Sequence, residues 1–438
     1  MMSRTGSIMP DSFRGLRRRI GISLVLTGLG MAPQILPLEG ADWNEFRGPS
    51  GRGIDPQANP PIQWMPGGWV GWRTPVPGKG WSSPVYQKNR LVLTTAEAGS
   101  EGRIALNVLC FDLSNIKLLW KKEVFSAQES SVKHDKNSHA SATPYLSEDR
   151  IFAHFGPLGT ACLDFEGEIL WRQSSLGYAS VHGNGSSPVL VGDRLIFHAD
   201  GQSDPAIIAL DADSGSVVWK QIRETEATRK FSFSTPLLVR VDGRPEIVSP
   251  ASGAVFGYSP VHGNELWRVD YGQGYSVVPR PVASEDSVFV ASGFGRPKVM
   301  SIRLGGRGNL SGSHVNWETS RSGPKTPSML FFEGRLYFVS DGGIVSSYQA
   351  GSGKLVWQDR IKGNVSASPI IAGRRIYLST EEGRVFVLKT GDQFEVVAQN
   401  DMKERVFASP AVDGDALIIR TESHLYRITA EGEGRRFF

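Results

Sequence analysis

Hydrophobic and polar residues alternate over short segments of this chain, and the segments are separated by Gly, Asp and Ser. The clearest repeat unit covers residues 183–219. Each of its apolar segments is short, rich in β-branched or aromatic residues and bounded by turn residues, which is typical of strands. We predict strands at 189–191, 194–198, 207–210 and 217–219. The unit therefore predicts a four-stranded antiparallel sheet.

The unit recurs at a spacing of 41 to 60 residues, close to the length of one propeller blade. A strand opens after each of eight prolines: Pro84, Pro144, Pro188, Pro236, Pro281, Pro327, Pro369 and Pro410. A closing strand that ends in Trp follows most of them, at Trp120, Trp171, Trp219, Trp267, Trp317 and Trp357, with a degenerate closer at Val397. The eighth closer lies before the first opener, at 69–73. We predict an all-β fold, an eight-bladed β-propeller of four-stranded antiparallel blades, whose C-terminal blade is completed by this N-terminal strand, which removes a free sheet edge.

Residues 1–41 do not follow the repeat. Arginines at 14 and 17–19 precede an uncharged apolar run at 20–32. This order is typical of a signal peptide, and the run is shorter than the ~20 residues that a membrane-spanning helix needs. An uncleaved anchor is the alternative. We expect an exported protein of the periplasm or cell envelope without an integral membrane span; since no Cys lies near the end of the leader, we do not expect a lipoprotein.

The expected domain organisation has three parts: a signal peptide at 1–41, an arm at 42–81 and the propeller at 82–438. The arm is rich in Gly and Pro, as linkers are, but it also holds six large aromatic residues: Trp43, Phe46, Trp64, Trp69, Trp72 and Trp81. Side chains of this size dominate burial energies. We therefore expect the arm to pack along the propeller of a monomeric protein. Residues 125–136 form a polar insertion that is a candidate mobile loop.

Charge and cysteine content narrow the possible functions. The leader holds five of the 48 basic and two of the 44 acidic residues, so the remainder is close to neutral and no nucleic-acid surface is expected. Cys110 and Cys162 occupy equivalent third-strand positions in neighbouring units. We interpret them as core residues, with a disulfide as the alternative. The histidines show no metal-ligand spacing, and no catalytic residues are expected.

One repeat carries a longer motif. Ala209, Asp211, Gly215 and Trp219 fit the pattern A-x-D-x-x-[ST]-G-x-x-x-W, which resembles the tryptophan-docking motif of quinoprotein dehydrogenase propellers. Together with 43–49 and 78–84, it resembles exported proteins with PQQ-like (pyrroloquinoline quinone-like) repeats, a family similar in its repeats to the outer-membrane assembly lipoprotein BamB. The residues themselves favour a structural role, in which Trp219 lies across the next blade; ligand binding is the alternative.

The resemblance leaves two functions open. A quinoprotein dehydrogenase of alcohols or sugars would need PQQ, a calcium site of clustered oxygen ligands, and a carboxylate base. The adjacent-cysteine disulfide of those enzymes is absent, and no matching set of Glu, Asn and Asp stands out. The sequence therefore favours a non-enzymatic envelope scaffold that binds a protein or polysaccharide on the propeller rim, without a cofactor. A PQQ- and calcium-dependent dehydrogenase is the alternative.

Side chains just before each opener should converge at one end of the central channel. They include Trp81, His139, Ser141, His182, Asn184, Phe231, Phe233, Arg280, Lys325 and Phe407. Aromatic, imidazole and basic groups in one funnel are suited to an acidic or sugar-like ligand or a peptide. The alternative is that they only fill and solvate the channel mouth.

Overall fold

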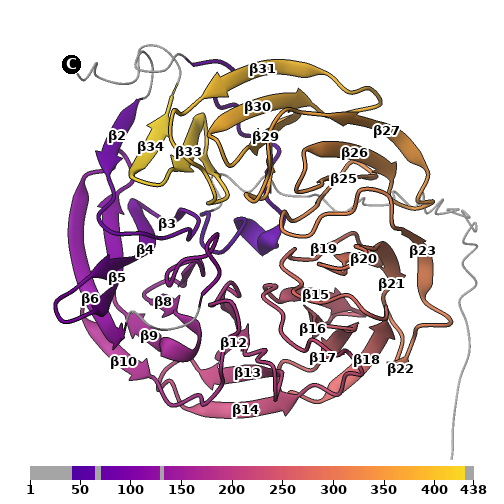
Figure 1. The fold of residues 1–438 in the computed structure, drawn as a ribbon, viewed down its shortest axis with the longest axis horizontal. Helices are drawn as coiled ribbons and strands as arrows, with labels where there is room; N and C mark the ends of the chain where they lie inside the picture. Colours follow the sequence, from indigo (N-terminus) through magenta and orange to yellow (C-terminus); the bar gives the residue numbers. More distant parts are fainter. Residues whose placement is uncertain (1–41, 65–70, 129–132, 430–438) are drawn as a thin grey trace, which may run out of the picture. The chain divides into compact units, whose positions relative to one another are not determined.

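Eight sheets stand around a common axis and form a closed ring (Figure 1). This computed structural model describes residues 42–64, 71–128 and 133–429, all within the unit Gly40–Phe438. Numbered in chain order, each blade has four antiparallel strands. The predicted eight-bladed propeller is confirmed.

The strands of the first four blades follow the repeat units in order. They are β3 (Val85–Gln87), β4 (Arg90–Ala98), β5 (Arg103–Asp112) and β6 (Leu118–Gln128); β7 (Tyr145–Leu146), β8 (Ile151–His154), β9 (Thr160–Leu163) and β10 (Ile169–Gln173); β11 (Val189–Val191), β12 (Arg194–His198), β13 (Ala206–Asp211) and β14 (Val217–Ile222); and β15 (Leu237–Val241), β16 (Arg244–Pro250), β17 (Ala254–Tyr258) and β18 (Glu265–Asp270). A short strand, β22 (Gly308–Asn309), is added in parallel to the outer edge of blade 4.

The last four blades follow the same order. They are β19 (Val282–Ala283), β20 (Ser287–Ala291), β21 (Val299–Arg303) and β23 (Val315–Thr319); β24 (Leu330–Phe332), β25 (Arg335–Val339), β26 (Ile344–Gln349) and β27 (Leu355–Arg360); β28 (Ile370–Ala372), β29 (Arg375–Ser379), β30 (Arg384–Lys389) and β31 (Val396–Asp401); and β32 (Ala411–Asp413), β33 (Ala416–Arg420) and β34 (His424–Ile428), completed by β2 (Trp72–Pro75). One 3-10 helix, η2 (Gly156–Leu158), interrupts blade 2.

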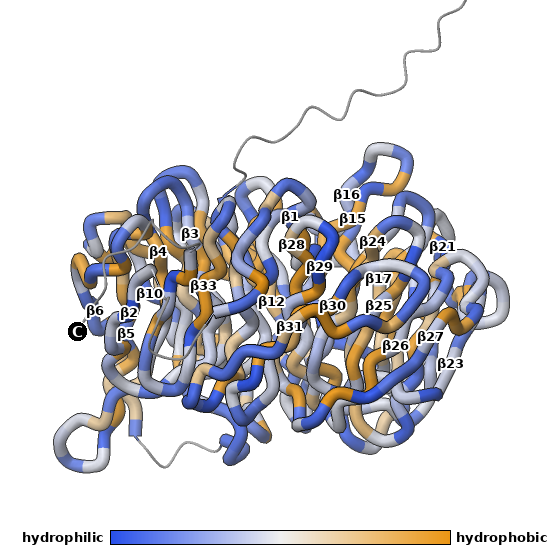
Figure 2. Tube along the Cα trace, turned by 90° about the horizontal axis from the view of Figure 1, so that it is seen from above, coloured by the Kyte–Doolittle hydropathy of each residue, from blue (hydrophilic) through white to orange (hydrophobic). Residues whose placement is uncertain are grey.

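The hydrophobic pattern explains which strands lie inside each blade. The middle strands β12 and β13 are almost wholly buried because neighbouring blades cover both of their faces, while the outer β14 alternates and has an exposed face. Figure 2 shows hydrophobic segments along the strands and hydrophilic turns at both ends. The core therefore lies between blades.

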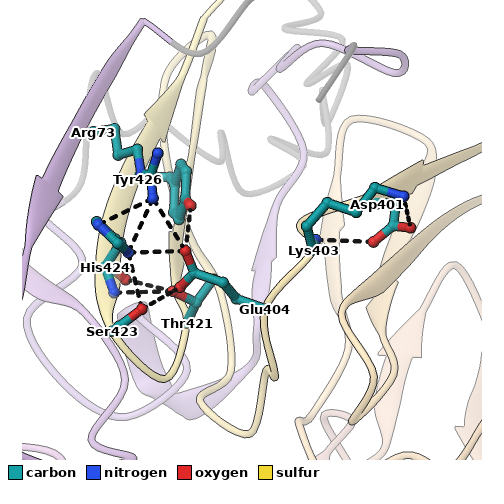
Figure 3. Close-up of polar contacts among 8 residues, drawn as sticks. All are labelled: Arg73, Asp401, Lys403, Glu404, Thr421, Ser423, His424 and Tyr426. Atoms are coloured by element: carbon teal, nitrogen blue, oxygen red, sulfur yellow. Dashed lines mark hydrogen bonds and ion pairs between the residues drawn. The ribbon is translucent and has the colours of Figure 1, made fainter. Parts of the chain in front are cut away.

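The ring closes where β2 pairs antiparallel with β34, with Trp72 opposite Arg427. This confirms the predicted closing strand from residue 72 onward, while residues 69 and 70 lie outside the described part of the chain. A polar cluster around Glu404 joins the two ends of the ring (Figure 3). The Glu404 carboxylate accepts hydrogen bonds from Thr421, Ser423 and Tyr426. It also pairs with Arg73 of β2 at 3.3 Å and with His424. Although burial alone would raise it, these hydrogen bonds lower the pKa of Glu404 to about 2.

Two local features, the start of blade 6 and the segment 125–136, differ from what the sequence predicts. Blade 6 opens two residues later than expected: Met329, not Pro327, directly precedes β24. The expected polar insertion at 125–136 begins as strand, since β6 extends to Gln128 and the long β4–β5 hairpin accounts for part of the wide first interval. Residues 129–132 lie outside the described part, so the mobile loop stays a prediction.

Cys110 and Cys162 are both buried and free, so the disulfide alternative is wrong. Burial raises the pKa of each thiol to about 12. Among the described residues, no helix has the length and hydropathy required to span a bilayer.

The arm, residues 42–64, crosses the ring at its axis. Trp43 O and Asn44 O accept hydrogen bonds from blades 1 and 2, and Gly53 O accepts one from blade 7, where β1 (Ile54–Asp55) pairs in parallel with β28. Between them, η1 (Pro49–Gly51) lies at the centre of the ring (Figure 1). The arm thus closes one end of the central channel.

Candidate functional site

A cavity of about 410 Å³ lies in the central channel, on the side of the arm from which the innermost strands begin. All eight connections that lead into these strands contribute to its wall, and Phe46 of the arm contributes too. Its rings are Phe46, Trp81, Phe231, Phe233, Tyr275, Phe294 and Phe407; its hydroxyl residues are Ser83, Ser141, Ser187, Thr235, Ser276, Thr326, Ser328, Ser366, Ser368 and Ser409; its basic residues are His134, Lys136, His182 and Arg229. No Asp or Glu is among the described residues of the wall.

A ring of hydroxyl residues holds the blades together at the inner end of this cavity. At equivalent positions just before the innermost strands, the backbone N–H of one blade donates to the side-chain oxygen of the next. The pairs are Ser83 to Thr143 (2.9 Å), Thr143 to Ser187 (2.9 Å), Ser187 to Thr235 (3.0 Å), Arg280 to Ser328 (3.0 Å), Ser328 to Ser368 (2.9 Å) and Ser368 to Ser409 (2.9 Å). The repeated small-Pro openers are therefore inter-blade contacts.

Arg280 occupies the fifth position of this ring, where the other blades have Ser or Thr. Its guanidinium donates to Glu45 Oε2 at 2.7 Å, to Phe46 O at 2.5 Å and to Pro236 O at 3.1 Å. The side chain is only 2 % exposed. Arg280 therefore anchors the arm across the channel and does not line the cavity.

Three cations surround the mouth, each over an aromatic ring of the wall. The Arg229 guanidinium lies 4.5 Å from the centre of the Tyr275 ring, Arg405 lies 4.7 Å from Phe407, and the Lys325 ammonium lies 5.5 Å from Phe294. Cations are attracted to the negative face of an aromatic ring. None of the three side chains forms an ion pair in the described part of the chain, although Lys325 N donates to Asp341 Oδ2 at 2.8 Å. The mouth is therefore cationic.

The connection between blades 1 and 2 reaches over this mouth. Lys136 Nζ pairs with Glu381 of blade 7 at 2.8 Å, and His134 N donates to His182 O. The rings of His134 and His182 meet edge to face. Burial, His134 and Arg229 lower the pKa of His182, so its imidazole is neutral at pH 7.

The structure brings together some of the ten residues expected in the funnel. Trp81, His182 and Phe233 line the cavity, and Lys325 lies at its edge over Phe294. His139 and Asn184 are placed nearby but not in the wall; Asn184 is turned toward the backbone, donating to Ser186 O. Ser141, Phe231 and Phe407, also expected there, are in the wall.

Sequence reasoning missed Phe46, Arg229, Tyr275, Phe294 and Arg405. Arg229 and Arg405 each precede a wall phenylalanine by two residues in the connection before an opener, a signal that could have found them. Phe46 could not be found in this way, because it comes from the arm.

The docking motif makes contacts between blades. Trp219 Nε1 donates to Pro260 O of blade 4 at 3.0 Å, and its ring lies against Gly263. The indole of Trp171 of blade 2 packs against Gly215 in the same way. Gly215 has a φ of +72°, and a Cβ at this position would lie 2.5 Å from the indole. Ala209, opposite Trp219 in the β13–β14 pair, is fully buried in the core.

Asp211 shapes the turn of the motif. Its carboxylate accepts from Ser214 N and Oγ, and these hydrogen bonds lower its pKa. Equivalent indole hydrogen bonds recur from Trp120, Trp171, Trp317 and Trp357 to the next blade. Trp267 differs, since it donates to Glu246 of its own blade. Five of these six tryptophans thus join neighbouring blades.

The sequence profile described as outer membrane protein assembly factor BamB matches residues 107–330 and 312–434. The chain belongs to this family. A BamB relative from Burkholderia pseudomallei is 25% identical over 272 residues, which span 60% of this chain and 67% of that protein.

Two solved structures are similar in fold to this BamB-family chain. BamB from Moraxella catarrhalis superposes on it with a TM-score of 0.58 at 13% identity, and the alignment covers 82% of this chain and 97% of the Moraxella chain. A europium-containing methanol dehydrogenase has a TM-score of 0.65 at 10% identity, with 90% and 99% covered. At such identities the similarity shows the shared fold alone.

The alternative function, a PQQ- and calcium-dependent dehydrogenase, would need oxygen ligands for the metal in this cavity. Calcium takes six to eight oxygen ligands, with carboxylates prominent among them. The described wall offers hydroxyls and cations but no carboxylate. Of the acids beside it, Glu381 is engaged by Lys136 and Ser366, and Asp341 by Lys325 N and Thr326. The described residues of this BamB-family cavity do not fit a calcium-bound quinone.

Proposed function

We propose that the chain is an exported, non-enzymatic interaction scaffold whose protein partner binds over the mouth of the cavity. The carrying observation is the mouth itself, where the side chains of Arg229, Lys325 and Arg405 lie over aromatic rings and form no ion pair with any described residue. Aromatic and arginine side chains are enriched among the residues that dominate protein interfaces. Because the hydroxyl ring and the docked tryptophans fix the blades, the connecting loops present these groups on a firm framework. The family description as an assembly factor favours a protein partner.

Site-specific photocrosslinking in the native cell envelope tests this proposal. A photoreactive residue is placed in turn at Arg229, at Arg405 and, as a control, at Arg240, which lies in the β15–β16 hairpin away from the cavity wall. The two mouth positions should give the same protein adduct and the control should not. A shared adduct that resists protease and is removed by glycosidase would replace the protein partner with a polysaccharide.

The enzymatic alternative has its own measurement. The purified chain is mixed with PQQ and calcium and assayed with alcohols and sugars and an artificial electron acceptor. Dye reduction at enzymatic rates would refute the non-enzymatic role.

Export is tested by intact mass of the protein from the envelope fraction. Cleavage between about residues 32 and 42 is expected for a signal peptide. Full-length mass or recovery from the cytosol would contradict export.

A further inference from the structure

Some hydroxyls of the cavity already donate to acceptors beside the wall, as Ser141 does to Asn137, Thr326 to Asp341 and Ser366 to Glu381, but others are free to donate. The hydroxyl oxygens of Ser187, Ser328, Ser368 and Ser409 each accept a backbone N–H from a neighbouring blade. Within the described chain, no acceptor receives the protons of these hydroxyls, although a hydroxyl can donate one hydrogen bond and accept two. A ligand in this cavity is therefore offered O–H donors from the wall and positive charge at the mouth.

Cations outnumber the carboxylates at the mouth, where Asp341 is bonded to Lys325 N and Thr326 Oγ1 and Glu381 to Lys136 and Ser366. Arg229 and Arg405 are exposed, lie on opposite sides of the wall in the connections before blades 4 and 8, and form no ion pair within the described residues. Lys136 is the wall cation that does have an acidic partner, Glu381. A ligand with negatively charged acceptor oxygens could accept hydrogen bonds from the cations of the mouth or from the hydroxyls of the ring.

The rest of the wall is apolar and aromatic. Phe231 lies 5.1 Å from His182, 6.1 Å from Phe233 and 6.1 Å from Tyr275, measured between ring centres, and Tyr275 lies 6.4 Å from Phe294. Rings spaced in this way offer both faces and edges to a planar ligand. The volume of about 410 Å³ falls in the range of pockets for small molecules.

We propose that the cavity binds a small aromatic carboxylate, with its ring among these aromatic side chains and its carboxylate on the donors. The arm supports a small molecule over a threaded chain, because Phe46 lines the cavity and the Glu45–Arg280 pair fixes the arm across the channel. The ligand must therefore end inside the cavity. This inference rests on the proposed function in treating the mouth as a recognition site.

Isothermal titration calorimetry of the purified chain tests the proposal with 2-naphthoate as the probe. Naphthoate should bind with 1:1 stoichiometry, and 2-naphthylmethanol, which has the same ring without the charge, should bind at least about tenfold more weakly, as for loss of a charge-assisted hydrogen bond. Since the attraction is partly electrostatic, the affinity for naphthoate should also fall as salt rises.

Matched variants locate the site. Because one carboxylate can pair with only one side of the mouth, at least one of Arg229→Gln and Arg405→Gln should weaken naphthoate binding by about tenfold. Arg240→Gln, whose side chain bonds Gly243 O on a distant turn, should leave the affinity unchanged. All three positions are on the surface, so thermal melts should match wild type.

Equal affinity for the acid and the alcohol, absence of binding heat at millimolar naphthoate, or unchanged affinity in both mouth variants would each overturn the proposal. The titration needs no partner. A failure here would therefore leave the crosslinking result standing, and a failure to crosslink would not affect the titration.

Discussion

The salt bridge between Arg280 and Glu45 allows a direct test of how the arm is held. It is largely withdrawn from solvent, with side chains 2 % and 11 % exposed and a separation of 2.7 Å. Replacing Arg280 with Met keeps an unbranched apolar stem but shortens the side chain by the guanidinium group. It removes the ion pair and the hydrogen bonds to Phe46 O and Pro236 O.

The expected loss follows from what remains behind. Breaking a buried ion pair by removing one partner typically costs about 3 to 5 kcal/mol, because the other charge stays buried without compensation. Part of this loss should be offset at Arg47, whose pKa is lowered to about 9 by burial and by the nearby charge of Arg280. We therefore expect a destabilisation near the lower end of that range.

Urea unfolding followed by tryptophan fluorescence measures the effect, and limited proteolysis of residues 42–64 reports whether the arm has loosened. The double variant Glu45→Leu with Arg280→Met is the control: since neither charge of this pair is left without the other, it should recover most of the stability lost in Arg280→Met. An Arg280→Met protein with wild-type stability and an equally protected arm would refute the anchoring role.

Three further predictions concern the ring. Gly215→Ala should lower the free energy of unfolding, measured in urea, by about 1 to 3 kcal/mol more than Gly192→Ala does. Both glycines have positive φ, but only at Gly215 would the new Cβ meet an indole, that of Trp171. Equal losses of stability in the two variants would contradict the docking model. Deleting residues 42–74 should leave β34 as an open edge and cause association in light scattering; a monomer that melts at the wild-type temperature would contradict closure. Glu404→Gln should destabilise the protein at pH 7. The difference in unfolding free energy from wild type should shrink as pH falls from about 5 to 2, since a carboxylate with a depressed pKa loses its contribution to stability over that range. A difference that does not depend on pH would exclude this carboxylate as the cause.

The eight-bladed ring could be predicted because its signals are local and repeated. The segments 189–191 and 194–198 coincide with β11 and β12, since period-two alternation and turn residues act within a few positions of the chain. The closing strand could be deduced from a missing member of the same series. The docking role of Trp219 followed from its place in the motif.

The candidate site was only partly accessible in this way. Position in the connections before the openers indicated Trp81, His182 and Phe233 correctly as neighbours in space. The same rule also selected Arg280, although its side chain turns to Glu45, 235 positions away in the chain. No local pattern contains such a contact.

The sequence by itself determined the number of blades, their strand order and the closure of the ring, because backbone pairing and turn chemistry depend on neighbouring residues. Tertiary structure alone decided that the arm crosses the channel, that Phe46 joins the cavity wall and that Arg229 and Arg405 stand over aromatic rings. These arrangements depend on packing between segments that are distant along the chain. The physical reason is that burial and charge pairing are satisfied by whichever groups the closed ring brings together, wherever they lie in the sequence.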